Sequence, residues 1–174
     1  MRAFLPILLA IITLQIKAEE GKTYTFNECR FSIELTSDWY IEASPKKDSK
    51  CELHIINNKS HSSVTELYVS LGRSEFLNVA SSNGFDYFKG DWVTLGRQSS
   101  YVKASEIQFG AWIGVKGKVH SGCHNGSGYI GICSHYSVVI REAKLIDGTV
   151  ILIRGRAINE QILKSTYETI KPVF

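Results

Sequence analysis

The dipeptide Asp147-Gly148 is the strongest local structural signal in this 174-residue chain, because it separates two runs rich in β-branched residues. The runs cover residues 138–146 and 150–157. An Asp-Gly pair accepts the positive φ angles of a two-residue hairpin turn, and β-branched side chains favour extended strands. The sequence therefore predicts a tight antiparallel hairpin in this region.

Other segments alternate apolar and polar residues, as half-buried strands do. Alternation predicts strands at residues 24–26, 31–35, 52–55 and 66–71, and residues 92–97, 101–109 and 111–119 are predicted to form a strand meander. Asn27 and Glu28 form the predicted turn between the first two strands, and the polar, Pro-containing residues 44–50 are predicted to be a surface loop.

Two helices complete the predicted elements. Ser74 is placed to cap a short helix that runs through Ala80 and ends at Gly84. Its expected apolar face consists of Phe76, Leu77 and Ala80. A second helix follows the N-cap Asn159, with Ile158 and Leu163 as a hydrophobic staple and Pro172 as its stop. The apolar stripe of this C-terminal helix needs a sheet face to cover, and it contains Ile162, Leu163, Tyr167 and Ile170.

The length suits one domain with a substantial core and is short for two. No internal repeat, low-complexity stretch or long linker divides the sequence. We therefore expect a single α+β domain over residues 19–174, in which a central antiparallel sheet is flanked by a short helix and a C-terminal helix.

The N-terminus has the three-part layout of a secretory signal peptide. Arg2 precedes an apolar run at residues 5–16, and Ile16-Lys17-Ala18 supplies the cleavage pattern. We expect residues 1–18 to be removed, no stable membrane insertion afterwards, and a periplasmic or secreted location. An uncleaved N-terminal anchor is the alternative interpretation of this segment. Loss of Arg2 and Lys17 lowers the Lys plus Arg count from 20 to 18 against 17 acidic residues. A charge so close to zero argues against a nucleic-acid partner.

Four cysteines remain in the exported chain: Cys29, Cys51, Cys123 and Cys133. An even number of cysteines in an exported chain favours disulfides over free thiols or zinc. Three connectivities are possible. We favour Cys29–Cys51 and Cys123–Cys133, because each pair flanks a plausible hairpin or loop.

The two ends of the chain resemble a known family. The resemblance rests on Tyr24-x-Phe26, Phe31-x-Ile33-x-Leu35, Asp38-Trp39, and the closing hairpin and helix at residues 158–170. These features resemble PsbP-like domains, whose fold is shared with Mog-type Ran-binding proteins and DcrB-type bacterial proteins. The family often has Pro before the acidic-Trp pair, where this chain has Thr36 and Ser37. The resemblance implies a binding or assembly module rather than a catalyst, and it carries no catalytic residues.

Residues 126–131 match the pattern G-x-G-x-x-G. A dinucleotide-binding loop needs a helix after the glycines, whose N-terminus meets the phosphate. Residues 132–140 instead continue as a predicted strand, so we expect a glycine-rich loop closed by Cys123–Cys133 and no cofactor.

Histidines and cysteines gather in the same region: His120, Cys123, His124, Cys133 and His135. Their spacing is not a recognised zinc pattern, and a Cys123–Cys133 bridge would leave only histidines. We therefore expect no metal. Cys123 beside His124 superficially suggests a thiol catalyst, but neighbours on a strand point to opposite faces. Ser127 lacks the G-x-S-x-G elbow, because Asn125 occupies the first glycine position. We predict no catalytic residue here.

The strand at residues 111–119 is the candidate for an interface. Ala111, Ile113, Val115 and Val119 are expected to face the core. Trp112, Lys116 and Lys118 share the other face with two glycines, and large aromatic and basic residues are common where partners dock. The alternative is that the sheet is covered on both sides and that Trp112 lies under a helix. Arg154 and Arg156 share a face of the last strand, and either join this patch or are simply solvated.

The sequence thus favours an exported, non-enzymatic module that holds a protein partner. An immunity protein that inhibits a toxic effector and an envelope assembly factor are two concrete forms. A small secreted hydrolase that uses Cys, Ser or His of residues 120–135 is the alternative.

Overall fold

The computed structural model describes residues 21–43, 51–57, 60–71, 75–96, 100–144, 149–155 and 160–173. Several sequence-based predictions fall outside these ranges. They are the signal peptide, the loop at 44–50, the caps Ser74 and Asn159, Ile158 of the staple, the turn Asp147-Gly148, and Arg156.

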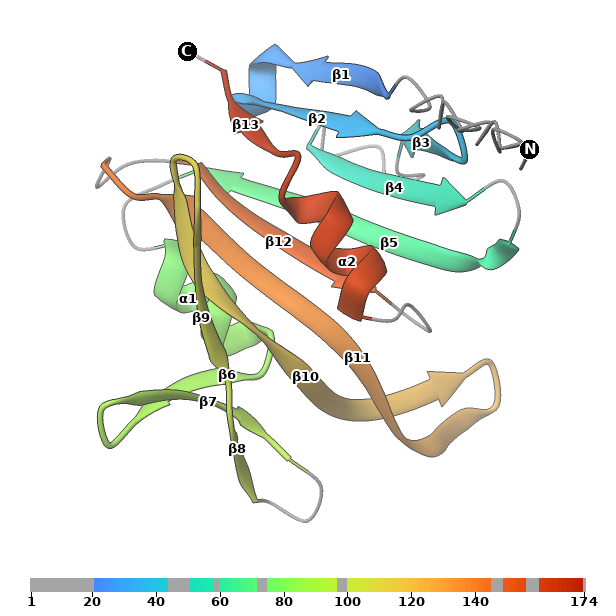
Figure 1. The fold of residues 1–174 in the computed structure, drawn as a ribbon. Coiled ribbons are helices and arrows are strands. Elements are labelled where there is room, and N and C mark those ends of the chain that lie inside the picture. Colours follow the sequence, from blue (N-terminus) through green and yellow to red (C-terminus); the bar gives the residue numbers. More distant parts are fainter. Residues whose placement is uncertain are drawn as a thin grey trace, which may run out of the picture.

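A seven-stranded antiparallel sheet forms the centre of the molecule (Figure 1). In spatial order its strands are β3 (Trp39–Ala43), β4 (Glu52–Asn57), β5 (Ser60–Leu71), β12 (Thr149–Gly155), β11 (Gly128–Glu142), β10 (Trp112–Asn125) and β9 (Ser105–Phe109). The pairing of β11 with β12 runs from Tyr136↔Gly155 to Arg141↔Val150. The two strands predicted on either side of Asp147-Gly148 are therefore confirmed as antiparallel neighbours. The predicted tight two-residue turn between them is wrong, because β11 ends at Glu142, β12 begins at Thr149 and Arg141 pairs with Val150.

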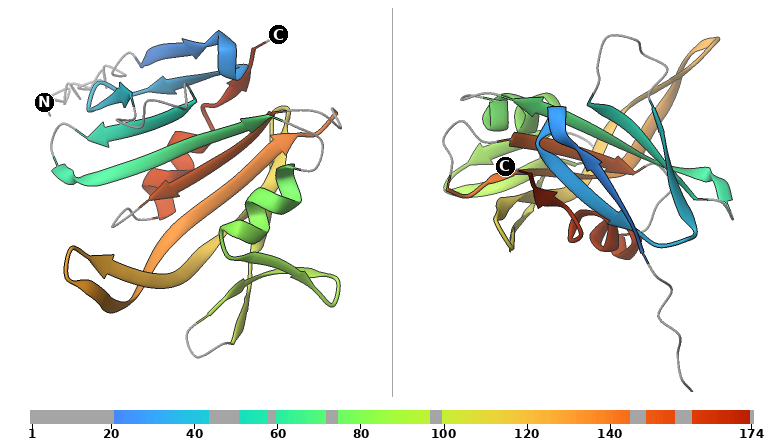
Figure 2. Two further views of the ribbon diagram at one scale, coloured as in Figure 1. Left: turned by 180° about the vertical axis from the view of Figure 1, so that it is seen from behind. Right: turned by 90° about the horizontal axis from the view of Figure 1, so that it is seen from above.

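Two three-stranded sheets accompany the central one. The first contains β1 (Lys22–Phe26), β2 (Phe31–Leu35) and β13 (Lys171–Pro172), with a 3₁₀ turn at Asn27–Cys29 in place of the predicted Asn-Glu turn. The second contains β6 (Phe85–Phe88), β7 (Asp91–Leu95) and β8 (Tyr101–Lys103). The two helices are α1 (Glu75–Ser82) and α2 (Glu160–Tyr167), and they lie on opposite sides of the central sheet (Figure 2, right).

Both faces of the central sheet are buried, and successive residues of β12 show this directly. Ile151 and Ile153 belong to a core that includes Phe31, Ile33, Trp112, Leu163 and Tyr167. Val150 and Leu152 belong to a second core that includes Val79, Ala80, Phe85, Val115 and Val119. Side chains of a strand alternate between faces, so the four consecutive apolar residues 150–153 of β12 need cover on both sides. β1, β2, β13 and α2 supply one cover, and α1 with the β6-β7-β8 sheet supplies the other.

The predicted architecture needs correction. We expected one central sheet flanked by two helices, whereas the described residues form three antiparallel sheets and only two helices of eight residues each. The residues at 85–103 explain the difference, because they form a separate small sheet over the second core instead of extending a meander. The fold is therefore mostly β. Among the described residues no helix is long and apolar enough to span a bilayer.

The predicted faces of the two helices are partly right. Leu163, Tyr167 and Ile170 are buried in the first core, as expected. Helix α1 buries Val79 and Ala80, but Leu77 is exposed rather than part of the buried face. Gly84 follows α1 with a φ of 82°, which confirms its role at the helix end.

Candidate functional site

Trp112, the predicted interface anchor, is a core residue. Its side chain is fully buried, and its indole Nε1 donates a hydrogen bond of 2.9 Å to the carbonyl oxygen of Ile170. The segment after α2 therefore covers this face of β10. The structure therefore shows the alternative, in which the segment at the C-terminal helix covers Trp112. Trp112 is not an exposed aromatic anchor.

The cationic candidates do not form one patch. Lys116 pairs across the sheet with Val138, which pairs with Ile153, so these three positions share the face of Trp112. Arg154 pairs with Ser137, which pairs with Gly117, and so it lies on the opposite face. Directly paired residues project to the same side of a sheet, so the register separates Arg154 from Lys116 and Lys118. Of the two lysines, Lys118 is exposed and Lys116 is half-buried.

The β10–β11 hairpin extends well beyond the rest of the central sheet (Figure 1). β9 pairs with β10 only from Trp112 to Lys116, and β12 pairs with β11 only from Tyr136 to Arg141. Among the described residues, therefore, no further strand of the central sheet lies beside the outer arm of the hairpin, residues 119–135. The ladder between β10 and β11 continues along the arm to Asn125↔Gly128.

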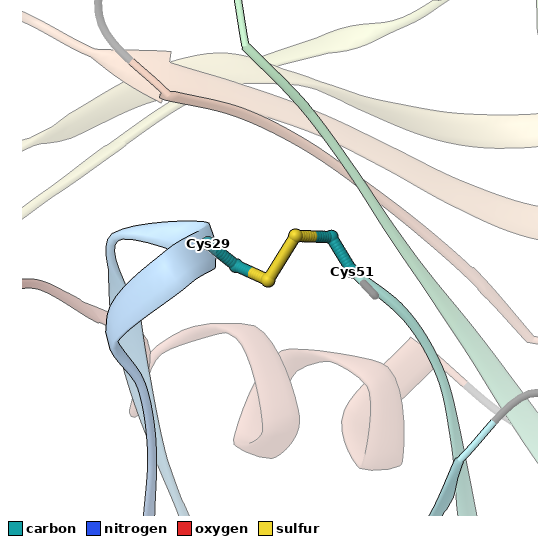
Figure 3. The surroundings of a disulfide bond; sticks show 2 residues. All are labelled: Cys29 and Cys51. Carbon is teal, nitrogen blue, oxygen red and sulfur yellow. A yellow bond between two sulfur atoms is a disulfide. The ribbon is translucent and has the colours of Figure 1, made fainter. Parts of the chain in front are cut away.

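Both predicted disulfides are confirmed. Cys123 and Cys133 bridge the two strands of the hairpin arm, with their Cα atoms 5.6 Å apart. Cys29 and Cys51 join the first small sheet to the entrance of β4, with their Cα atoms 5.7 Å apart (Figure 3). No cysteine of the described residues is free.

The end of the hairpin exposes three large apolar side chains. Tyr129 is 62% exposed, Ile130 is 60% exposed and Ile132 is 54% exposed. The register slips between Cys123 and His124, because Cys123 pairs with Gly131 and His124 with Tyr129, which leaves Ile130 without an opposite residue. We call residues 123–133 with these three side chains the hairpin tip. Large apolar side chains gathered at one projecting point are unusual on a monomer surface and mark interaction sites.

The hairpin tip contains no Asp, Glu, Lys or Arg, and the nearest charged residues along the two strands are basic. Residues 107–141 contain no Asp or Glu, while they contain Lys116, Lys118 and Arg141. A complementary surface would carry an apolar patch with carboxylates at its edge.

The glycine-rich pattern, Ser127 and Cys123 are all parts of the hairpin. Gly126 and Ser127 form the turn of the hairpin, and β11 follows them directly, so no helix N-terminus faces the glycines. The Ser127 N–H donates to the Asn125 side-chain oxygen at 2.8 Å, and the His124 ring contacts Tyr129 edge-on, with ring centroids 5.6 Å apart. The sulfur of Cys123 is bonded to Cys133, so it supplies no thiolate in this oxidised form.

The histidines do not converge either. His120 pairs with Ser134, whereas His135 pairs with Val119, so His120 and His135 project to opposite faces of the hairpin. Among the described residues no three potential metal-ligating side chains gather together.

A second surface feature is a groove of about 720 Å³ on the α1 side of the sheet. Its floor contains Gln108 and Ile113, and its walls contain Phe76 and Leu77 of α1 and Trp92 of β7. Two charged side chains, Glu106 and Arg141, also line it. The sequence pattern gives no sign of this groove, because its lining comes from five elements (α1, β7, β9, β10 and β11) that only the fold brings together.

One buried acid lies near the end of the central sheet. Glu142 pairs with Trp112 and is 5% exposed. Burial raises the pKa of the Glu142 carboxyl above its ordinary value, while the positive charge of Arg30 and the Thr149 backbone N–H act in the opposite direction. On the surface of the β6-β7-β8 sheet, the Asp91 carboxylate accepts a bond of 2.8 Å from the Lys103 ammonium and raises the Lys103 pKa.

Comparison with solved structures identifies the fold as PsbP-like. Cyanobacterial PsbP (CyanoP) from Synechocystis sp. PCC 6803 is similar over 91% of this chain and 95% of its own, with a TM-score of 0.51 and 6% sequence identity. A crystal structure from Bacteroides thetaiotaomicron is similar over 89% of this chain, with a TM-score of 0.52 and 11% identity. This chain spans about half (49%) of that second protein. No protein-family model and no curated protein sequence matches this chain.

Proposed function

We propose that this chain is an exported, non-enzymatic binding module that holds a protein partner through the hairpin tip. The single observation that carries the proposal is the exposure of Tyr129, Ile130 and Ile132 at the end of a hairpin that projects from the sheet. Hiding these side chains from water would provide the driving force for association. The PsbP-like fold and the two disulfides support an assignment to a binding module outside the cytoplasm.

The disulfide of the hairpin favours binding in a second way. Cys123–Cys133 links the strands just below the apolar side chains, so the tip is held in one conformation before it meets a partner. A preorganised element loses less conformational entropy on binding. Because residues 107–141 contain no acidic residue and include Lys116 and Lys118, we propose that the partner has an apolar patch with carboxylates around it.

An immunity protein for a toxic effector and an envelope assembly factor are the two concrete forms of this proposal. The hydrolase alternative has less support, because the sulfur of Cys123 is bonded and His120 and His135 point to opposite faces. The identity of the partner distinguishes the two forms. An immunity protein binds and inhibits an enzyme, whereas an assembly factor binds a component of the cell envelope.

Site-specific photocrosslinking tests the proposal. A benzophenone amino acid is placed at Tyr129 and, as the control, at Leu77, which is equally exposed but lies on α1. In the cells that make the protein, the Tyr129 position should yield one discrete protein adduct that the Leu77 position does not. The double substitution Ile130→Ser and Ile132→Ser should abolish that adduct without lowering the melting temperature. Identical adducts from both positions, or no protein adduct at Tyr129, would contradict the proposal.

A further inference from the structure

The groove beside α1 has the size and composition of a small-molecule site. Its volume of about 720 Å³ falls within the range of ligand pockets, ~300–1,000 Å³. Its lining is mainly apolar, with a few polar groups of the kind that orient a ligand. It lies on the face of the sheet opposite Trp112, and the hairpin tip does not line it.

The register of the central sheet arranges the groove floor in two rows. Ile113 pairs with Gln108 on one side and with Arg141 on the other, so these three side chains form one row. Val115 pairs with Glu106 in the next row. Arg141 and Glu106 are therefore diagonally opposed across the floor, on the outer strands β11 and β9, with the apolar side chains of β10 between them.

Aromatic rings form the wall above this floor. The rings of Phe76 and Trp92 meet edge-on, with centroids 5.8 Å apart, and Trp92 makes a similar contact with Tyr87 at 5.5 Å. Phe76 and Trp92 are only half-buried, so part of each ring remains available to a ligand. Flat apolar molecules pack well against such rings.

Arg141 is the feature that selects the charge of the ligand. Its guanidinium lies 5.7 Å from the centroid of the Phe76 ring, and its Nη1 donates to the carbonyl oxygen of Glu142 at 3.2 Å. Within the described part of the chain, no carboxylate forms an ion pair with it. A half-buried guanidinium on an aromatic ring retains donors that fit a carboxylate or sulfonate, and the low-polarity surroundings strengthen such a bond.

We propose that this groove binds a small organic anion, with the anionic group on Arg141 and an apolar body against Phe76, Trp92 and Ile113. The solvent-exposed Glu106 at the opposite corner keeps the anion at the Arg141 end and disfavours a second negative charge on the ligand. This inference is independent of the proposed function, because it uses a different surface and no residue of the hairpin tip.

Titration with the fluorescent anion 8-anilinonaphthalene-1-sulfonate tests the inference. The oxidised wild-type protein should bind the probe saturably, and Arg141→Gln should weaken binding at least about tenfold. Arg141→Lys, which keeps the positive charge, should retain most of the affinity. Ile132→Ser in the hairpin tip is the control and should leave the affinity unchanged. Absence of saturable binding to the wild type, equal affinity of Arg141→Gln, or loss of binding in Ile132→Ser alone would overturn the inference.

A second pair of variants covers the case in which Arg141→Gln does not fold. Leu77 lines the groove from the exposed face of α1, so its replacement should not disturb the core. Leu77→Glu adds a negative charge beside the groove and should weaken probe binding more than the uncharged Leu77→Gln. Equal binding by these two variants would contradict an anion site. Displacement of the probe by dodecanoate or by benzoate then shows whether the apolar body is an alkyl chain or an aromatic ring.

Discussion

The indole Nε1 of Trp112 donates a hydrogen bond to the carbonyl oxygen of Ile170, and both residues are buried. The bond joins the first residue of β10 to the segment between α2 and β13, which are 58 residues apart in the sequence. Trp112 thus fastens the C-terminal segment to the central sheet. It contributes to stability rather than to a binding surface.

Replacement of Trp112 should therefore destabilise the fold strongly. Trp112→Ala leaves a large cavity in the core and should cost ~3–5 kcal/mol of unfolding free energy. Trp112→Phe keeps much of the volume but leaves the Ile170 carbonyl unpaired, and should cost ~1–3 kcal/mol. Chemical denaturation measures both values. Tyr129→Ala is the control, since its exposed side chain contributes little, and a Trp112→Ala variant as stable as this control would refute the structural role.

The two disulfides should contribute unequally. Cys29–Cys51 encloses a longer loop than Cys123–Cys133, with sequence separations of 22 and 10. The loop-entropy relation gives about 3.4 and about 2.7 kcal/mol for these bridges. Cys29 is also buried in the core, so replacing it with a polar residue adds to the loss. We expect the double mutant Cys29→Ser/Cys51→Ser to be less stable in urea denaturation than the double mutant Cys123→Ser/Cys133→Ser. The reverse order would show that the hairpin bridge supports the core.

Thiol titration provides a simpler test of the same bonds. The denatured, unreduced protein should contain no free thiol, because all four cysteines are paired. Two or more free thiols per chain would exclude at least one bridge in the isolated protein. The same experiment after reduction should find four.

Glu142 should make stability depend on pH in a specific direction. Burial raises its pKa in the folded protein above the unfolded value, so protonation of Glu142 favours the folded state. Its contribution is most favourable below the unfolded pKa and is lost as the pH rises through the folded pKa. The Glu142→Gln variant keeps the side-chain shape but cannot ionise, so its stability should not fall with the ionisation of this residue. The variant should therefore become more stable relative to the wild type as the pH rises from acidic to neutral. Urea denaturation at several pH values measures the difference, and the exposed Glu106→Gln is the control. A constant difference at all pH values would contradict the assignment.

Gly84 should tolerate no side chain. Its φ of 82° disfavours other residues, and an added Cβ would lie 2.5 Å from Cγ1 of the buried Val119. Gly84→Ala combines this strain with overpacking and should cost ~2–4 kcal/mol. Gly90 has a similar φ of 89° but open space around its Cβ position, so Gly90→Ala should cost only about 1 kcal/mol. Equal melting temperatures for the two variants would show that the contact with Val119 relaxes freely.

Much of the local structure was predictable because it depends on neighbouring residues. Alternation identified β2 and β4, and the Cys spacing suggested the correct pairs. The apolar stripe of Leu163, Tyr167 and Ile170 correctly indicated a face that needs a partner. The sequence also contained an indication of the exposed hairpin tip, because the apolar residues Tyr129, Ile130 and Ile132 lie next to glycines and between two cysteines. We interpreted those residues only as a flexible loop.

The sequence by itself indicated many of the strands and which residues share a face of each predicted strand, and it favoured the correct pairing of the cysteines. Only the tertiary structure decided which of those faces are covered. Period-two alternation predicts that Trp112 and Val115 lie on opposite faces of β10. The sequence pattern alone cannot show that other elements cover both of these residues, one in each core. Strand register likewise placed Arg154 away from Lys118, and the packing of α1 and β7 on the sheet brought Phe76 and Trp92 beside Arg141 at one groove. Such long-range neighbours follow from the packing of whole sheets, because only packing brings distant segments into contact.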